Sequence, residues 1–145
     1  MLGRKKSFGR AEQSEISDRL SILLSVQLAV SGIKSNEVTK IEVTKGNINR
    51  KAIGYIYGFI DCALQFRDQD ITDISVGLPI LYHVMRNLFP GHEQAYIDFL
   101  MCHMEDEVVV LGMMAGGQEY NEFIQANGTG FGLAKFIREC QNQQE

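Results

Sequence analysis

The sequence predicts an all-α protein, a single-domain irregular or orthogonal bundle of five or six helices. Apolar residues recur at intervals of three and four along most of the 145-residue chain, which is the period of an α-helix. Only two prolines interrupt the chain, and the longest helix-compatible run without one extends from Gly91 to Phe123. Hydrophobic residues make up 45% of the sequence, enough for one buried core at this length.

The run from Gly91 to Phe123 predicts one long helix. Apolar residues on one of its faces recur at helical spacing: Ile97, Leu100, Met101, Met104, Val108, Leu111 and Ala115. The neighbouring face is acidic in its first half and nearly without side chains in its second: Asp98, Cys102, Glu105, Val109, Gly112 and Gly116. We expect contacts on both sides, and we allow for a kink or an end at Gly116 and Gly117.

The first ten residues predict a flexible basic arm, because they hold four Lys and Arg and only two large apolar residues. A helix is expected to follow, capped by Ser14 or Ser17, whose hydroxyl can accept from free first-turn N–H groups. Gly32 would end this helix after about Ser31, since glycine adopts the left-handed C′ conformation without penalty. Its apolar stripe comprises Ile16, Leu20, Leu23, Val26, Val30 and Ile33.

The middle of the chain holds the predicted central helix. Residues 34–46 satisfy neither the helical nor the strand period and are expected to form a loop. Residues 48–67 are apolar almost all the way round, so this helix should be buried. Gly54 and Gly58 lie four residues apart, as do Gly112 and Gly116, and each pair would let a second helix approach closely. Because a mid-helix glycine costs about 1 kcal/mol relative to alanine, a packing reason is expected.

The remaining elements follow from proline, glycine and apolar spacing. Pro79 is predicted in the first turn of a third helix, where its missing N–H costs nothing, with Pro90 and Gly91 ending that helix. A last helix is predicted from Leu133 to about Asn142. The single helical domain would thus span residues 11–142, with a frayed tail at 143–145.

The charge of −4 is unevenly distributed. Residues 11–145 carry 10 Lys and Arg against 18 Asp and Glu, and the 48 residues from Asn87 to Ala134 contain no Lys or Arg at all. Seven carboxylates lie in that span, so this half of the protein should repel phosphates and attract cations or basic partners. Nucleic acid is expected at most as a contact of the basic arm 1–10.

Cysteine usage and hydropathy predict a cytoplasmic protein. The chain has three cysteines, an odd number that leaves at least one without a disulfide partner: Cys62, Cys102 and Cys140. They show neither CxxC nor Cys/His spacing, which is typical of reduced thiols. No apolar run reaches the roughly 18 residues of a membrane span. Neither a signal peptide nor a membrane contact is expected.

Two groups of polar residues on predicted helices are candidates for chemistry. His103 and Glu107 lie four apart on the predicted long helix and, with Asp98, form a weak candidate metal site. Asp61 lies in an apolar helix, where a carboxylate needs a partner; a buried structural hydrogen bond is favoured over catalysis. His103, Glu107 and Asp61 are also the weak catalytic candidates.

The carboxylates of Asp68, Asp70 and Asp73 have the density of a calcium loop. Counting from Asp68, an EF-hand requires glycine at position six and glutamate at position twelve, but these positions hold Asp73 and Pro79. Helix capping by Asp70 or Asp73 is the simpler prediction.

Asn127 to Lys135, NGTGFGLAK, contains a glycine-rich stretch that resembles the last glycine box of the ATP-binding fold of histidine kinases and gyrases. The resemblance covers six residues, GTGFGL. That family also has an asparagine helix and an acidic glycine box on a β-sheet, and this chain has neither. A flexible turn is therefore predicted, with no nucleotide site.

The favoured function is non-enzymatic binding of another protein, as an adaptor or regulator, and no cofactor is expected. The partner would be a basic protein or a second copy in a homodimer, and the contact residues would be Met101, Met104, Glu105, Asp106 and Glu107. The alternative is a metal-binding protein or metal-assisted hydrolase that uses the acidic and histidine cluster of the 91–123 helix.

Overall fold

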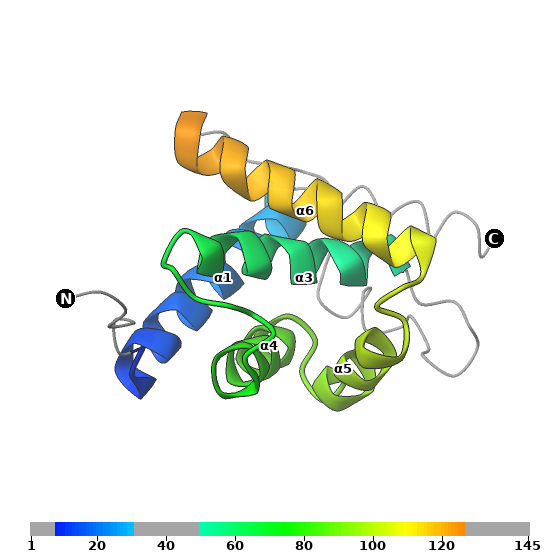
Figure 1. The fold of residues 1–145 in the computed structure, drawn as a ribbon, viewed down its shortest axis with the longest axis horizontal. Coiled ribbons are helices and arrows are strands. Elements are labelled where there is room, and N and C mark those ends of the chain that lie inside the picture. Colours follow the sequence, from blue (N-terminus) through cyan, green and yellow to red (C-terminus); the bar gives the residue numbers. More distant parts are fainter. Residues whose placement is uncertain (1–7, 31–49, 127–145) are drawn as a thin grey trace.

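The computed structural model describes residues 8–30 and 50–126. Within these residues the chain forms helices and no strand, so the predicted all-α class is confirmed. The five helices, labelled in Figure 1, are α1 (Arg10–Val30), α3 (Arg50–Gln65), α4 (Ile74–Leu88), α5 (Glu93–Cys102) and α6 (Glu107–Ala126).

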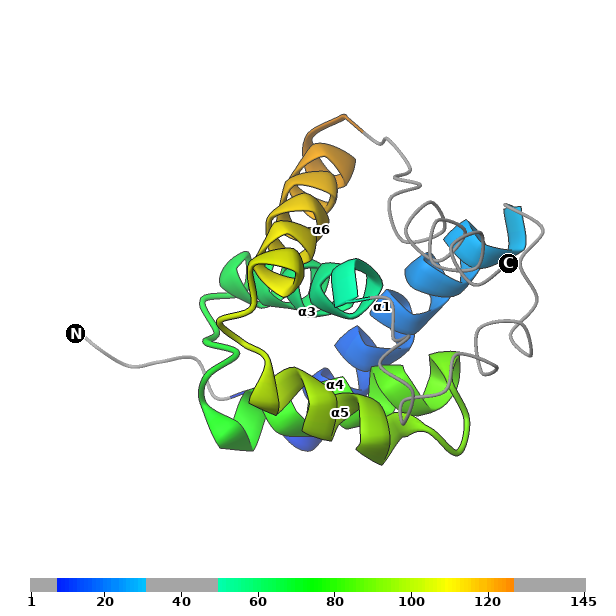
Figure 2. The ribbon, with the colours of Figure 1, turned by 90° about the vertical axis from the view of Figure 1, so that its right-hand side faces the viewer.

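The helices form two layers with α3 at the centre. Figure 2 shows α3 and α6 in one layer and α4 and α5 in the other. Helix α6 packs on α3, α1 packs on α4, and α5 contacts both α4 and α3. Eleven consecutive or nearly consecutive positions of α3 are buried, among them Tyr55, Ile56, Ile60 and Leu64, so the predicted central position of this helix is confirmed.

The two glycine pairs face each other across the contact between α3 and α6. A Cβ atom at Gly54 would lie 2.1 Å from the carbonyl oxygen of Val109, and one at Gly112 would lie 2.2 Å from that of Lys51. The predicted close helix approach is therefore confirmed: each pair removes the side chains that would hold the opposite backbone away. An edge-to-face contact between aromatic rings, with centroids 5.0 Å apart, joins Phe59 and Tyr120 further along.

Helix α1 begins at Arg10, so the predicted cap at Ser14 or Ser17 is wrong. Ser17 is buried inside the helix, and its hydroxyl donates to the Gln13 carbonyl at 2.7 Å. Ser21 is buried one turn later, donates to Ser17 in the same way and accepts from Asn87 of α4 at 3.1 Å. These hydroxyls bond within their own helix, which allows a polar face to be buried against α4. Helix α1 is described as far as Val30, and the predicted end near Ser31 and Gly32 lies outside the described residues.

Helix α4 begins at Ile74, five residues before Pro79, so the prediction that Pro79 lies in its first turn is wrong. Asp73 is the N-cap, and its carboxylate accepts from the Ser75 backbone N–H at 3.0 Å. Pro79 cannot donate to the carbonyl four residues earlier, that of Ser75. The side-chain amide of Gln13 on α1 donates to that carbonyl instead, at 3.3 Å.

The predicted single helix from Gly91 to Phe123 is wrong, because it is two helices. Helix α5 ends at Cys102, and α6 begins at Glu107 after a turn. The turn changes the helix direction, so the apolar face predicted across both parts is not continuous: Met101 and Leu111 are exposed. Gly116 and Gly117 do not end a helix, since α6 continues through them to Ala126.

Part of the prediction lies outside the described residues. This applies to residues 1–7 of the basic arm, the loop 34–46, the NGTGFGLAK stretch, the helix from Leu133 to Asn142, the tail 143–145 and Cys140. Residues 8–10 of the predicted arm are described: Phe8 is half-buried against the core, and Arg10 is helical. No helix among the described residues combines the length and the apolar character needed to cross a membrane.

Candidate functional site

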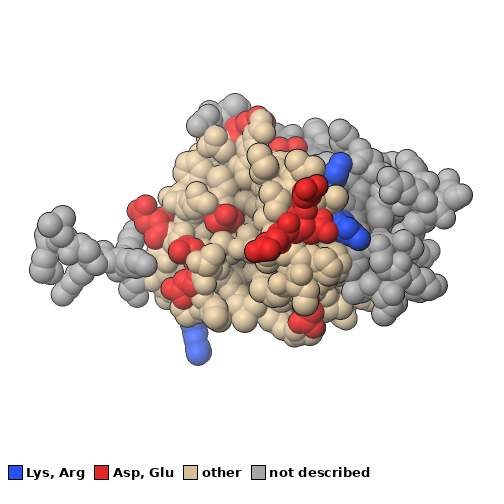
Figure 3. Space-filling view, turned by 45° about the vertical axis from the view of Figure 1, so that its right-hand side comes forward, with Lys and Arg blue, Asp and Glu red and all other residues tan. Residues whose placement is uncertain are grey.

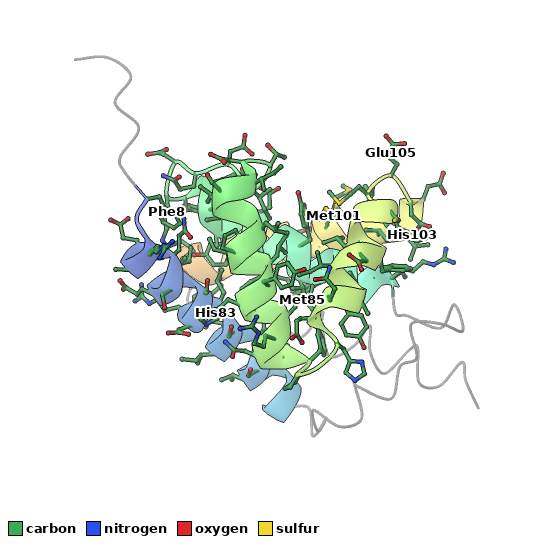
Figure 4. The ribbon with its side chains drawn as sticks, turned by 90° about the horizontal axis from the view of Figure 1, so that it is seen from below. Phe8, His83, Met85, Met101, His103 and Glu105 are labelled. Atoms are coloured by element: carbon green, nitrogen blue, oxygen red, sulfur yellow. The ribbon has the colours of Figure 1, made fainter. Side chains whose placement is uncertain are left out.

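The predicted contact residues lie together where α5 turns into α6. We call residues 101–107 the α5–α6 corner. His103 donates its backbone N–H to Leu100 at 3.1 Å, and Asp106 donates its own to His103 at 3.1 Å, which closes the turn. Figure 4 shows Met101, His103 and Glu105 at the end of α5, with Glu105 pointing away from the helices.

Asp106 has a structural role in the corner. Its Oδ1 accepts from the backbone N–H groups of Val108 at 2.9 Å and Val109 at 3.4 Å, which makes it the N-cap of α6. Its Oδ2 accepts from Arg50, the first residue of α3, at 3.1 Å. Desolvation acts to raise the pKa of Asp106, but the two backbone donors, with Arg50 and His103, outweigh it and hold the pKa below its usual value. Both carboxylate oxygens of Asp106 therefore already accept hydrogen bonds from groups within the protein.

His103 is separated from Glu107 by the turn, so their predicted pairing on one helix face is wrong. The imidazole stacks on Phe99 with ring centroids 4.0 Å apart, and its Nδ1 lies 2.7 Å from the Phe99 carbonyl oxygen. A carbonyl only accepts, so Nδ1 carries the proton in this contact. These contacts fix the orientation of the ring of His103, which is the C-cap residue of α5.

Met101, Glu105 and Glu107 are accessible in the corner, as is Cys102. Met101 is 49% exposed, and both glutamates are exposed. Among the described residues, the ion pairs involve neither Glu105 nor Glu107. Met104 is half-buried and packs against the core, so it connects the corner to the rest of the fold. Figure 3 shows Asp and Glu side chains at several places on the face it draws, including one cluster that has Lys or Arg side chains beside it.

Asp61 and Asp98, the other candidates, are not brought to the corner. Asp61 is only half-buried on α3 and accepts from Gln65 at 3.1 Å, so the expected buried hydrogen bond is a surface one. Asp98 is exposed on α5 and accepts from Gln94 at 2.8 Å. Burial, and next the Asp61 carboxylate, raise the pKa of the neighbouring Cys62 thiol, the opposite of what activates a nucleophile.

The described residues hold no group of three or more His, Cys, Asp or Glu arranged to bind a metal ion. The two other histidines are engaged elsewhere. His83 lies 2.7 Å from Asp18 of α1, and the ring of His92 stacks near Tyr96. The proposed metal alternative thus has no ligand set in the part of the chain that is described.

The aspartates between α3 and α4 shape the loop. Asp73 caps α4 as predicted, while Asp70 accepts from the backbone and hydroxyl of Thr72 at 2.9 and 2.7 Å. Asp68 has a positive φ of 56°, and the N–H groups of Asp68 and Gln69 donate to Gln65 and Leu64. This is a Schellman motif that ends α3, with Asp68 where glycine is usual.

One cleft lies away from the corner. Its volume is about 470 Å³, and it lies between the start of α1 and the loop after α3. It is lined by Arg19 and Arg67 as well as by Glu12, Glu15 and Asp68. Such a mixture favours neither an anionic nor a cationic ligand.

The sequence prediction missed the exposed side of α6. Glu107, Leu111, Met114, Gln118 and Glu122 are all exposed, and they recur at three- and four-residue steps; we call them the α6 outer face. The signal was present in Gly112 and Gly116: because these glycines mark the side facing another helix, Leu111 and Met114 must point away from it.

Comparison of the chain with protein-family models, with curated proteins and with solved structures finds no match. No relative therefore supplies a substrate, a cofactor or a partner for the α5–α6 corner.

Proposed function

We propose that this protein acts by binding another protein, as an adaptor or regulator, through the α5–α6 corner. One observation carries the proposal: Glu105 and Glu107 are exposed without an ion pair in the described part of the chain, on either side of Asp106, which is held by Arg50. Met101 adds an exposed, flexible apolar side chain beside them.

Charge supports a basic partner. Helices α5 and α6 contain no Lys or Arg, so no cation within them offsets the carboxylates of the corner. A positive surface would relieve the repulsion between these carboxylates and speed the encounter, since complementary charge acts mainly on association rate and specificity. Binding should weaken as salt rises, because exposed charges are screened over about 8 to 10 Å.

The free thiols of Cys62 and Cys102 support a reducing, cytoplasmic setting as part of the same proposal. The basic partner can be a separate protein, or the residues Arg4, Lys5 and Lys6 of a second copy in a homodimer. Static light scattering at low and high salt separates these two cases. A salt-sensitive dimer that is lost on removing residues 1–7 would identify the second copy as the partner.

The experiment compares proteins retained from lysate by three immobilised baits. These are the natural protein, the corner variant Glu105→Lys/Glu107→Lys, and a control with the same charge change at exposed positions of α1, Glu12→Lys/Glu15→Lys. Asp106 is left intact because it caps α6. We expect the natural protein and the control to retain a shared set of proteins that the corner variant loses. An identical set on all three baits would refute the proposal.

The alternative of a metal-binding protein or metal-assisted hydrolase is tested separately by elemental analysis after purification without chelator. The proposal expects no stoichiometric metal. Stoichiometric metal that disappears with His103→Ala would favour the alternative, because His103 was its principal candidate ligand.

A further inference from the structure

The α6 outer face is set by the way α6 packs. Of the described helices, only α3 packs extensively on α6. The contact side of α6 contains Val109, Gly112, Gly116 and Tyr120, all of them buried. The opposite side is the α6 outer face, and no described helix covers it.

The centre of the α6 outer face is apolar. Leu111 is 55% exposed and Met114 is 66% exposed, and because they lie three residues apart their side chains are neighbours on the helix surface. Single exposed apolar residues are normal in proteins, but two adjacent ones on a helix face that no described helix covers offer a contact point for a partner. Methionine adapts its shape to a partner with little strain.

The ends of the α6 outer face are acidic. Glu107 and Glu122 lie fifteen residues apart, which is roughly 22 Å along the helix axis. Gln118, between them, donates to Glu122 at 3.1 Å and leaves its charge uncompensated. Glu105 of the corner extends the acidic end beyond Glu107.

This charge pattern disfavours a second α6 as the occupant. In an antiparallel pair, Glu107 of one copy would face Glu122 of the other, and in a parallel pair each carboxylate would face its own equivalent. Like charges placed opposite each other oppose association. A helix with basic residues at both ends and apolar residues in the middle matches the pattern without such repulsion.

We infer that the α6 outer face docks a basic amphipathic helix of a partner protein. Two apolar side chains of the partner, three or four residues apart, pack on Leu111 and Met114, while Lys or Arg side chains reach Glu107 and Glu122. To span both carboxylates, the partner helix needs about four turns, or roughly 15 residues. The inference rests on the proposed function and specifies the chemistry of its partner.

The test is a fluorescence anisotropy titration with synthetic peptides. The probe is a 16-residue helix of Leu and Lys with all leucines on one face; its control has the same composition in an order that gives no apolar face. We expect the amphipathic peptide to bind and the control peptide to bind at least about tenfold more weakly. Replacing Lys by Glu in the probe should abolish binding.

Variants of the full chain locate the contact. Leu111→Ser/Met114→Ser should weaken probe binding about tenfold or more, whereas Ile22→Ser/Ile74→Ser, at two exposed apolar positions of α1 and α4, should not. Glu107→Lys/Glu122→Lys should weaken it and reduce its salt dependence, while Glu12→Lys/Glu15→Lys should have little effect.

Three outcomes would overturn the inference. The first is equal binding of both peptides, and the second is no binding of either. The third is peptide binding that is lost with Glu105→Lys but unchanged by Leu111→Ser/Met114→Ser. This result would rule out the docking site on α6 but would agree with the proposed role of the corner. The two tests share Glu107, but Leu111→Ser/Met114→Ser changes the α6 outer face alone and Glu105→Lys changes the corner alone, so the two proposals can fail separately.

Discussion

The backbone of Gly58 packs against the carbonyl group of Met113, and a methyl group at Gly58 would lie 1.9 Å from that carbonyl oxygen. The reciprocal contact exists as well: a methyl group at Gly116 would lie 2.0 Å from the carbonyl oxygen of Tyr55. Helices α3 and α6 therefore meet backbone to backbone. Since this contact fixes which side of α6 is buried, it also determines which side is left exposed.

Substituting Gly58 tests this contact. Gly58→Ala forces a side-chain atom against the backbone of α6, so we expect it to lower the free energy of unfolding by at least about 2 kcal/mol. The measurement is the midpoint of denaturant unfolding. The matched control is Gly117→Ala, whose Cβ would lie 3.6 Å from the nearest atom, at ordinary contact distance. Because alanine is the better helix former, the control should be neutral or stabilising by up to about 1 kcal/mol. Equal effects at both positions would contradict the packing.

The close approach of α3 and α6 was predictable from glycine spacing, but the break between α5 and α6 was not predicted. Neither proline nor glycine lies between His103 and Asp106, and the apolar period runs through the break. The available signal was Asp106 followed by Glu107, an N-cap residue with an acidic first turn. In sequence this signal was hidden within a block of carboxylates, where Asp106 could not be distinguished from its exposed neighbours.

Other features depend on contacts between distant residues. The start of α4 was misplaced because Pro79 is usually found in a first helical turn, and nothing local indicates that Gln13 supplies a donor to the Ser75 carbonyl from another helix. Similarly, buried Ser17 and Ser21 resemble cap residues in sequence. Their burial depends on the packing of α1 against α4, which no local pattern reports.

The substitution Pro79→Ala should stabilise the protein by about 1 to 3 kcal/mol, because it restores the helical donor to the Ser75 carbonyl. Gln13→Ala should cost about 1 kcal/mol in the natural protein. In the Pro79→Ala background the backbone N–H of residue 79 can donate to the Ser75 carbonyl. Loss of the Gln13 side-chain amide should therefore cost less there. Urea unfolding of the two single variants and the double variant measures this coupling. Strictly additive effects would show that Gln13 does not compensate for Pro79.

The end of α3 should be improved by glycine. Asp68 holds a left-handed conformation, which costs L-residues about 1 to 2 kcal/mol, with aspartate among the more tolerant. We expect Asp68→Gly to raise the thermal midpoint and Asp68→Ala to lower it. A lower midpoint for the glycine variant would mean that the Asp68 carboxylate contributes more than its backbone conformation costs.

Asp106 should make stability depend on pH in a known direction. Its pKa in the folded protein lies below the ordinary 3.8, so its contribution is present above that value and is lost as pH falls through the folded value. Asp106→Asn keeps an oxygen for the backbone of Val108 but loses the charge that pairs with Arg50. Unfolding measured across acidic pH should show the natural protein more stable at neutral pH and the two proteins converging in acid. A difference that is constant with pH would contradict the assigned roles of Asp106.

The most direct test of partner binding on α6 is NMR of methyl-labelled methionine in the full chain, with the amphipathic Leu/Lys peptide added. Met114 and Met101 are exposed near the proposed contact, whereas Met85 is fully buried in the core and acts as an internal reference. If a basic helix docks on the α6 outer face, the Met114 and Met101 signals should shift with a common saturation curve while the Met85 signal remains in place. Binding of the peptide with no change at Met114 would contradict it.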